Sequence, residues 1–281
     1  MKQFPRASLL MLALGSAATL SSCAVFSGKP PLPKQVSIER LPKPATDTDY
    51  APVVAGADVI YFPADRAASG ARSEPSAMLL EALQRDGTPY AIAWNLIDAS
   101  QQPLLDELQS KAGAARDQVI ARLELAGTGR AREHCRSVLR EARFASVRHL
   151  AVGVPAPLLA NIRVGTISPD DEKRISAGYN PPPGASEEYA ERFASSRSAG
   201  AVDLAGAYRA HVMTQQFLAE QIVGHFRGAG AGGKLLVFLR RDDIEGVPVY
   251  VAQKASLRQV ILASDVPSQE RRKLLTQTAE Q

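Results

Sequence analysis

Short apolar segments that alternate with helical stretches constrain the fold of this chain more than any other feature. Nearly continuous apolar runs recur along the sequence, at residues 58–62, 90–94, 148–154, 234–239 and, more briefly, 247–252. Runs of this length are typical of strands that are covered on both faces, as in a parallel sheet. Apolar residues at helical spacing mark the segments between them, such as 74–85 and 102–144. The sequence therefore predicts an α/β fold with a mainly parallel central sheet flanked by helices.

A helical insertion interrupts this alternation before the last strands, at about residues 157–228. A proline-rich turn at 180–184 divides the insertion, and helical periodicity then continues from about 203 to 226. We assign residues 57–265 to one α/β domain that contains this helical subdomain. Residues 266–281 are predicted to form a C-terminal helical tail.

The first 22 residues have the pattern of a signal peptide. Lys2 and Arg6 provide a positive start, and an apolar stretch then runs to Leu20. This stretch is shorter than the roughly 20 strongly apolar residues that span a bilayer. It ends in Leu-Ser-Ser-Cys, which resembles the lipobox of bacterial lipoproteins. The resemblance implies cleavage before Cys23 and attachment of acyl chains such as palmitate to its thiol.

The segment after the cysteine is predicted to be an extended tether from 23 to 56. It has few large apolar residues and many prolines, namely Pro30, Pro31, Pro33, Pro42, Pro44 and Pro52. The residue after Cys23 is Ala24 and not aspartate, which resembles the signal for sorting to the outer membrane in enteric bacteria. We therefore expect a protein of the cell envelope, anchored by lipid in the outer membrane and facing the periplasm.

Charge and cysteine content exclude other classes of protein. Removing Lys2 and Arg6 with the signal peptide lowers the formal net charge from +4 to 4 − 2 = +2. Such a mild charge, without a dense basic run, argues against nucleic acid as a partner. Cys135 is the only cysteine of the sequence besides Cys23, so no internal disulfide is expected in the lipidated protein.

The order of several short patches resembles the ChaN-like haem-binding lipoproteins, a haem-uptake family of the Tiki superfamily. The patches that carry the resemblance are 59–61, 91–105 with its Gln-Pro-Leu-Leu ending, 157–162 with 168–172, and 236–238 with 246–248. The resemblance implies that haem, or another small apolar ligand, is bound in iron handling. Members of the family can hold haem at a dimer interface, which implies a homodimer.

The chain departs from the family at the positions of the catalytic groups. The Glu and His of the first loop fall on Pro63 and Asp65, the Glu that ends the second strand falls on Asn95, and the last His falls on Asp243. A metal-dependent hydrolase needs several converging His or carboxylate ligands, so we expect neither catalysis nor a metal ion. Two alternatives stay open: Asp65 and Asp243 could together bind a hard cation, or Asp243 could lie in a solvated turn.

The long helix of the insertion supplies the candidate haem-binding residues. Its predicted buried stripe contains Leu204, Tyr208, His211, Gln215, Leu218, Ile222 and His225. Tyr208 and His211 lie one turn apart, and both residue types ligate haem iron. Arg209 beside them could pair with a propionate, and Tyr250 is a further candidate. The alternative is a buried tyrosine and histidine that only support the core.

Two other functions compete with that of a ligand-binding lipoprotein. The first is a catalytically silent scaffold of the envelope that binds another protein. The second is a metal-dependent hydrolase of the Tiki and erythromycin-esterase-like superfamily. A shift of the Soret band on adding hemin separates the binding protein from the scaffold, and metal analysis tests the hydrolase.

Replacing Cys23 by serine or alanine is predicted to release the protein from the membrane, or to leave it as an unprocessed precursor. Without the thiol there is no acceptor for the diacylglyceryl group, and stable anchoring needs at least two acyl chains. Metabolic labelling with a radioactive fatty acid measures the attachment. Equal labelling of wild type and variant would contradict the lipobox interpretation.

Overall fold

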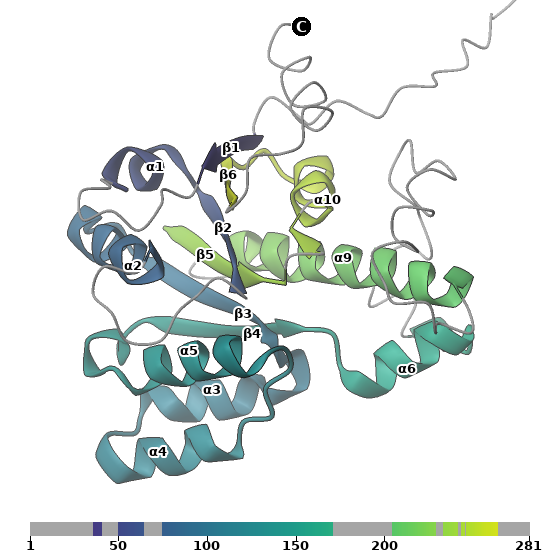
Figure 1. The fold of residues 1–281 in the computed structure, drawn as a ribbon, viewed down its shortest axis with the longest axis horizontal. Coiled ribbons are helices and arrows are strands. Elements are labelled where there is room, and N and C mark those ends of the chain that lie inside the picture. Colours follow the sequence, from purple (N-terminus) through teal and green to yellow (C-terminus); the bar gives the residue numbers. More distant parts are fainter. Residues whose placement is uncertain are drawn as a thin grey trace, which may run out of the picture.

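The computed structural model describes residues 36–40, 50–64, 75–170, 204–228, 233–240, 243–244 and 246–263. Within this part the strands form one six-stranded sheet in the order β1-β6-β2-β5-β3-β4 (Figure 1). All pairs of neighbouring strands are parallel. The predicted α/β class with a parallel central sheet is therefore confirmed.

The strands are β1 (Val36–Arg40), β2 (Val59–Pro63), β3 (Tyr90–Asp98), β4 (Arg148–Gly153), β5 (Lys234–Leu239) and β6 (Gln259–Ala263). The helices are α1 (Ala51–Gly56), α2 (Pro75–Asp86), α3 (Gln102–Gln109), α4 (Gly113–Arg122), α5 (Gly129–Arg140), α6 (Ala156–Val164), α9 (Leu204–Arg227) and α10 (Val247–Lys254). Short 3-10 turns, η2 (Ala99–Gln101) and η3 (Ala142–Phe144), precede α3 and β4.

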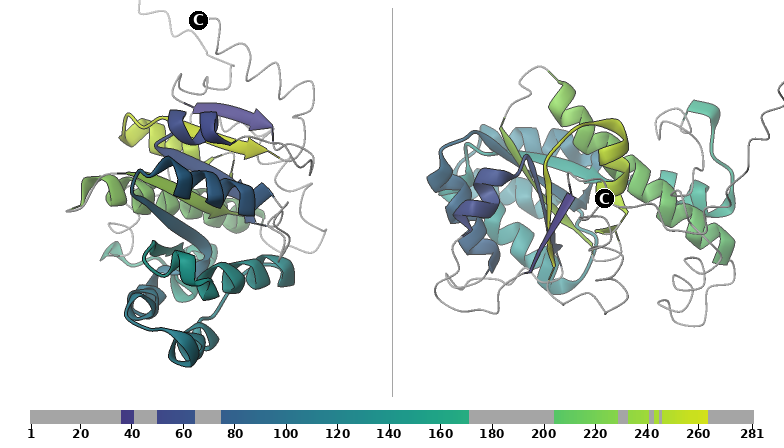
Figure 2. Two further views of the ribbon diagram at one scale, coloured as in Figure 1. Left: turned by 90° about the vertical axis from the view of Figure 1, so that its left-hand side faces the viewer. Right: turned by 90° about the horizontal axis from the view of Figure 1, so that it is seen from above.

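Helices cover both faces of the sheet. Successive strand residues point to opposite faces, so in β2 Ile60 and Phe62 pack with α1 to α5, whereas Val59 and Tyr61 pack with α9 and α10. The view from above in Figure 2 shows the sheet between α1 and α2 on one side and α9 and α10 on the other. Burial on both faces explains why the strands are apolar throughout, without alternation of polar residues.

The predicted strand at 247–252 is wrong, because this segment forms the helix α10. Its apolar, β-branched composition suggested a strand. The buried residues Val247, Tyr250 and Val251 are nevertheless spaced as on one helical face, and Pro248 lies in the first turn, where proline is favoured. The strand that follows β5 is β6, which the sequence analysis did not identify.

The sheet also includes part of the segment that was predicted to be a tether. β1 pairs with β6 from Val36↔Gln259 to Arg40↔Ala263, and α1 follows in the same segment. The high proline content suggested an extended chain, but the run 36–40 contains no proline and can join a sheet edge. Cys23 and the signal peptide lie outside the described residues.

The helical insertion forms an arm beside the sheet. α6 and the first half of α9 pack together through the cluster Leu158, Ile162, Ala210, Met213 and Phe217, and the arm extends away from the strands (Figure 1). The prediction of a long helix near 203–226 is confirmed by α9. The predicted turn at 180–184 and tail at 266–281 lie outside the described residues. Among the helices that the structure describes, none is long and apolar enough to cross a membrane.

The outer edge of β4 is closed by a side chain. The Gln102 amide accepts a hydrogen bond from the Ala151 N–H at 2.7 Å and donates one to the His149 carbonyl at 3.1 Å. The His149 carbonyl and the Ala151 N–H lie on either side of Leu150, and in a longer sheet they would form hydrogen bonds with a neighbouring parallel strand. The amide therefore satisfies polar groups that an edge strand would leave open for pairing.

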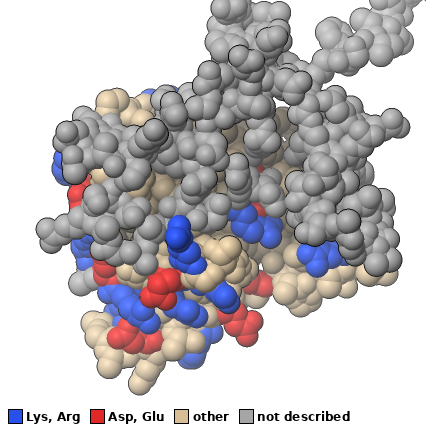
Figure 3. Space-filling model, viewed as in Figure 1, with Lys and Arg blue, Asp and Glu red and all other residues tan. Residues whose placement is uncertain are grey.

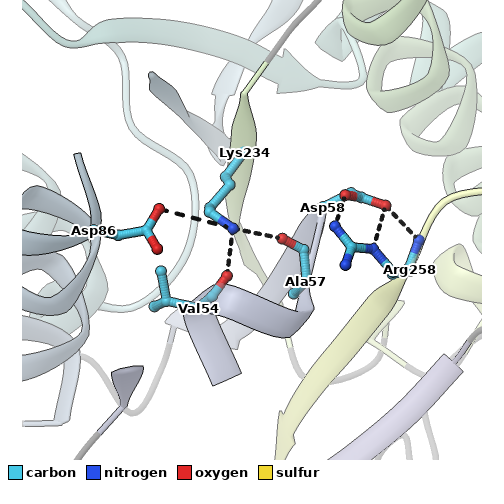
Figure 4. Close-up of polar contacts among 6 residues, drawn as sticks. All are labelled: Val54, Ala57, Asp58, Asp86, Lys234 and Arg258. Atoms are coloured by element: carbon cyan, nitrogen blue, oxygen red, sulfur yellow. Dashed lines mark hydrogen bonds and ion pairs between the residues drawn. The ribbon is translucent and has the colours of Figure 1, made fainter. Parts of the chain in front are cut away.

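Polar contacts also close the amino-terminal edge of the sheet (Figure 4). Lys234 Nζ, at the start of β5, donates to the carbonyl oxygens of Val54 at 2.5 Å and Ala57 at 3.3 Å, and lies 3.8 Å from Asp86. Asp58 accepts hydrogen bonds from the Arg258 side chain and backbone, and these bonds hold the pKa of its carboxyl below the usual value. This edge thus joins α1, β2, β5 and β6 and has a structural role.

His149 of β4 is buried in an aromatic cluster, beside Trp94 on the face of the sheet that α5 covers. Trp94 Nε1 donates to His149 Nδ1 at 3.2 Å, and the two rings stack, as do those of Trp94 and Phe238. Because Nδ1 accepts this bond, the imidazole is neutral with its proton on Nε2. Burial lowers the pKa of His149 to about 4.

Acidification is predicted to destabilise the fold through His149. The unfolded chain takes up this proton below a pH of about 6.5, whereas the folded chain does so only near pH 4, so stability falls across that window. The shift corresponds to about 3 kcal/mol. His149→Gln keeps an acceptor for Trp94 but cannot titrate. Urea unfolding at pH 7 and 4.5 should show a smaller loss in the variant, and equal losses would contradict the assignment.

Candidate functional site

The candidate site lies at the carboxyl-terminal ends of β3 and β5, where α9 crosses the sheet. Asn95 lies in β3, Asp243 follows β5, and His211 lies in α9; all three side chains are buried. Ligands of parallel α/β sheets bind outside the carboxyl ends of the strands. The fold therefore brings polar side chains together at the edge where a ligand is expected.

Asp243 is the centre of this cluster. Its side chain is fully buried, and Oδ2 accepts hydrogen bonds from Asn95 Nδ2 and Arg240 Nε, each at 2.9 Å. The other oxygen, Oδ1, lies 3.8 Å from His211 Nδ1 and has no hydrogen-bond partner within the described ranges. A buried carboxylate needs such donors, because an unpaired charge in the interior is costly.

Gln215 positions the opposite side of the His211 ring. Gln215 Nε2 lies 2.9 Å from His211 Nε2, one helical turn further along α9. Gly246 makes room for this amide, because a Cβ at residue 246 would lie 2.0 Å from Gln215 Oε1. Both ring nitrogens of His211 thus face protein groups, one towards Gln215 and the other towards Asp243.

A glycine also permits the placement of Asn95. The register of β3 against β4 shifts between Trp94 and Asp98, which is the mark of a local bulge. A Cβ on Gly153 of β4 would lie 2.7 Å from the carbonyl oxygens of both Asn95 and Ile97. The absence of a side chain at residue 153 therefore allows β3 to bend towards β4 where Asn95 leaves the regular ladder.

The structure places most of the positions that were predicted from the family resemblance. Asn95 and Asp243, two of the positions that the resemblance singled out, are in direct contact. Pro63 ends β2 and is buried, whereas Asp65 lies outside the described residues. The alternative of a solvated turn at Asp243 is wrong, because Asn95 and Arg240 hold its carboxylate inside the protein.

The candidate haem-binding residues differ in their surroundings. Tyr208 and Arg209 belong to α9, but their side chains lie outside the described part of the structure. His211 is only 6% exposed and is held in the Asp243 cluster. Tyr250 is 2% exposed and packs in the core between the sheet, α9 and α10, away from solvent.

Arg240 and Gln215 are site residues that the sequence analysis did not select. Gln215 was recognised as part of the buried stripe of α9, and its spacing of four from His211 was the available signal. Arg240 follows the last apolar run directly, which places it at the carboxyl edge of the sheet. No motif marks either residue, because their contacts join segments far apart in the sequence.

Within the described residues, which do not include Asp65, no three His, Cys, Asp or Glu side chains are grouped so that they could hold a metal ion. Cys135 is a free, fully buried thiol on α5, and burial raises its pKa, which favours the unreactive protonated form. In the view of Figure 3, basic and acidic side chains are interspersed over α3, α4 and α5, so that surface is not of a single charge.

The fold is similar to that of a solved structure of ChaN from Campylobacter jejuni, which is described as showing cofacial heme binding. The match has a TM-score of 0.53 and covers 78% of this chain and 85% of that chain, at 14% sequence identity. The ChaN-like fold that the resemblance implied is thereby confirmed, but at this identity no residue role is transferred. No protein-family model and no curated protein matches this chain.

Replacing Asn95 by aspartate is predicted to destabilise the protein at neutral pH. Two carboxylates would then meet where an amide now donates to Asp243, so one of them must take up a proton. We expect a loss of about 2 kcal/mol or more at pH 7.5, relative to wild type. Because the pKa of the pair is raised in the folded state, part of this loss should disappear as the pH falls.

Asn95→Leu is the matched control, since it removes the same donor without adding a charge. Its deficit relative to wild type should stay the same at pH 7.5 and pH 5 in urea unfolding. If Asn95→Asp and Asn95→Leu show the same dependence on pH, the contact with Asp243 does not govern the stability of this site.

Proposed function

We propose that this chain is a lipid-anchored protein of the bacterial cell envelope that binds haem without catalysing a reaction. The observation that carries the proposal is the position of Tyr208 and His211 on α9, where the arm meets the carboxyl edge of a ChaN-like sheet. The structural neighbour, the ChaN of Campylobacter jejuni, is described as binding heme. Haem would supply an iron atom, which Tyr208 or His211 would hold, and a flat apolar body, which an apolar surface would cover.

The arm offers these features. Met213 and Phe217 of α9 pack with Leu158 and Ile162 of α6 in a cluster of its own, apart from the two clusters of the sheet. Leu159 and Ile167 are only partly buried against that cluster. A mainly apolar wall with a few polar groups suits a cofactor of this kind.

Tyr208 is the better candidate for the residue that would hold the iron. His211 Nε2 already meets Gln215, and binding iron would require that buried contact to break. Positions three apart on a helix are separated by about 4.5 Å along the axis, so Tyr208 lies one turn further out on the arm. We therefore assign the iron to Tyr208 and a supporting position to His211.

The absence of catalysis rests on the chemistry of the cluster. Asn95 has an amide and cannot act as a base, and the Asp243 carboxylate is engaged by Asn95 and Arg240. Anchoring through Cys23 and residence in the outer membrane facing the periplasm rest on the N-terminal sequence. Because the family can hold haem between two copies, binding should strengthen with protomer concentration if a homodimer forms.

Titration with hemin is predicted to give a ferric high-spin spectrum in wild type, and Tyr208→Phe should weaken binding at least tenfold or remove the spectrum. A tyrosinate ligand accounts for both results. His211→Gln should retain the tyrosinate spectrum. Tyr250→Phe is the matched control, because it removes another tyrosine hydroxyl, from a buried position on α10.

Circular dichroism must show that each variant keeps its helicity. Loss of the spectrum in His211→Gln with retention in Tyr208→Phe would move the iron to the histidine. A wild-type protein that leaves the Soret band of hemin unshifted would refute haem binding and favour the scaffold function.

A further inference from the structure

We infer that Arg240 binds a carboxylate substituent of the ligand at the carboxyl edge of the sheet. This inference rests on the proposed function and adds the group that recognises the acidic side chains of a porphyrin. It assigns that role to the residue directly after β5, and not to Arg209 of α9.

Arg240 lies at the boundary between the buried cluster and the surface. Its side chain is 44% exposed, whereas its partner Asp243 is fully buried. The single hydrogen bond between them runs from Nε to Oδ2 at 2.9 Å, and Asn95 donates to the same oxygen. The buried carboxylate of Asp243 therefore binds the Arg240 guanidinium through Nε alone.

The terminal nitrogens of Arg240 are not used by this contact. A guanidinium has five N–H donors, and Nε supplies one of them, so four remain on Nη1 and Nη2. In the part of the chain that the structure describes, neither Nη nitrogen has a hydrogen-bond or ion-pair partner. The fork formed by these two nitrogens matches the two oxygens of a carboxylate.

The hydrogen bond to Asp243 fixes the position of the Arg240 side chain before a ligand binds. An arginine whose side chain is already fixed loses less conformational freedom when it binds a carboxylate. Asp243 also contacts α9 through His211, at 3.8 Å between Oδ1 and Nδ1. One buried carboxylate thus links Arg240 to His211, on the helix whose backbone also carries Tyr208 three residues earlier.

The test compares iron-free protoporphyrin IX with its dimethyl ester, which lacks the charged carboxylates, on wild type and Arg240→Gln. Iron-free probes report carboxylate recognition without the tyrosine ligand. Glutamine can still donate to Asp243, so the variant is expected to fold. Arg132→Gln is the matched control, because it removes the same charge from an exposed position on α5, on the opposite face of the sheet.

Wild type should bind the free acid at least tenfold more tightly than the ester, as expected for a charge-assisted hydrogen bond. Arg240→Gln should lose that preference and bind the ester as wild type does, whereas Arg132→Gln should match wild type on both probes. If Arg240→Gln weakens both probes equally, or neither, the inference is overturned while hemin binding by wild type leaves the proposed function intact. A wild type that binds neither hemin nor protoporphyrin overturns both.

Discussion

A parallel sheet has to be covered on both faces, and this requirement places most of the helices that the structure describes. Apolar side chains point from β2, β3 and β5 into both layers, so neither layer can be removed without exposing one face of the sheet. The helices that follow the strands therefore return across the sheet. The same parallel arrangement brings the carboxyl ends of β3 and β5 to one edge, and the candidate site depends on that coincidence.

The sequence predicted the strands from β2 to β4 but missed β1 and β6, which lie together at one side of the sheet. β2, β3, β4 and β5 are recognisable because burial on both faces demands unbroken apolar runs. β1 was missed because a strand at the edge of a sheet can carry polar residues, such as Ser37 and Glu39. β6 was missed although four of its five residues are apolar; it begins with Gln259, whose side chain bonds Tyr61 and the Pro248 carbonyl. The helix α10 was missed because its β-branched residues favour a strand locally, and packing against α9 outweighs that preference.

The candidate site, like the sheet, was predicted from the sequence only in part. The resemblance to a known family drew attention to Asn95 and Asp243 as positions where catalytic groups are replaced. The helix α9 was predicted, and of its predicted stripe His211, Gln215, Leu218 and Ile222 are buried, whereas the side chains of Leu204 and Tyr208 lie outside the described part of the structure. The contacts that turn these positions into a cluster join residues 148 apart in the sequence, as in the bond between Asn95 and Asp243. Periodicity and spacing report only neighbours along one element, so they could not reveal that Arg240 and His211 share the same carboxylate.

Side-chain amides replace backbone hydrogen-bond partners at two places, beside residue 124 and along the outer edge of β4. Gln101 exchanges two hydrogen bonds with the backbone of Glu124, and Gln102 does the same with β4. For Gln102 the consequence concerns self-association. A second copy could not lengthen the sheet at residues 149–151 without first displacing this amide, so stacking of two protomers into a continuous twelve-stranded sheet through β4 is disfavoured from the outset.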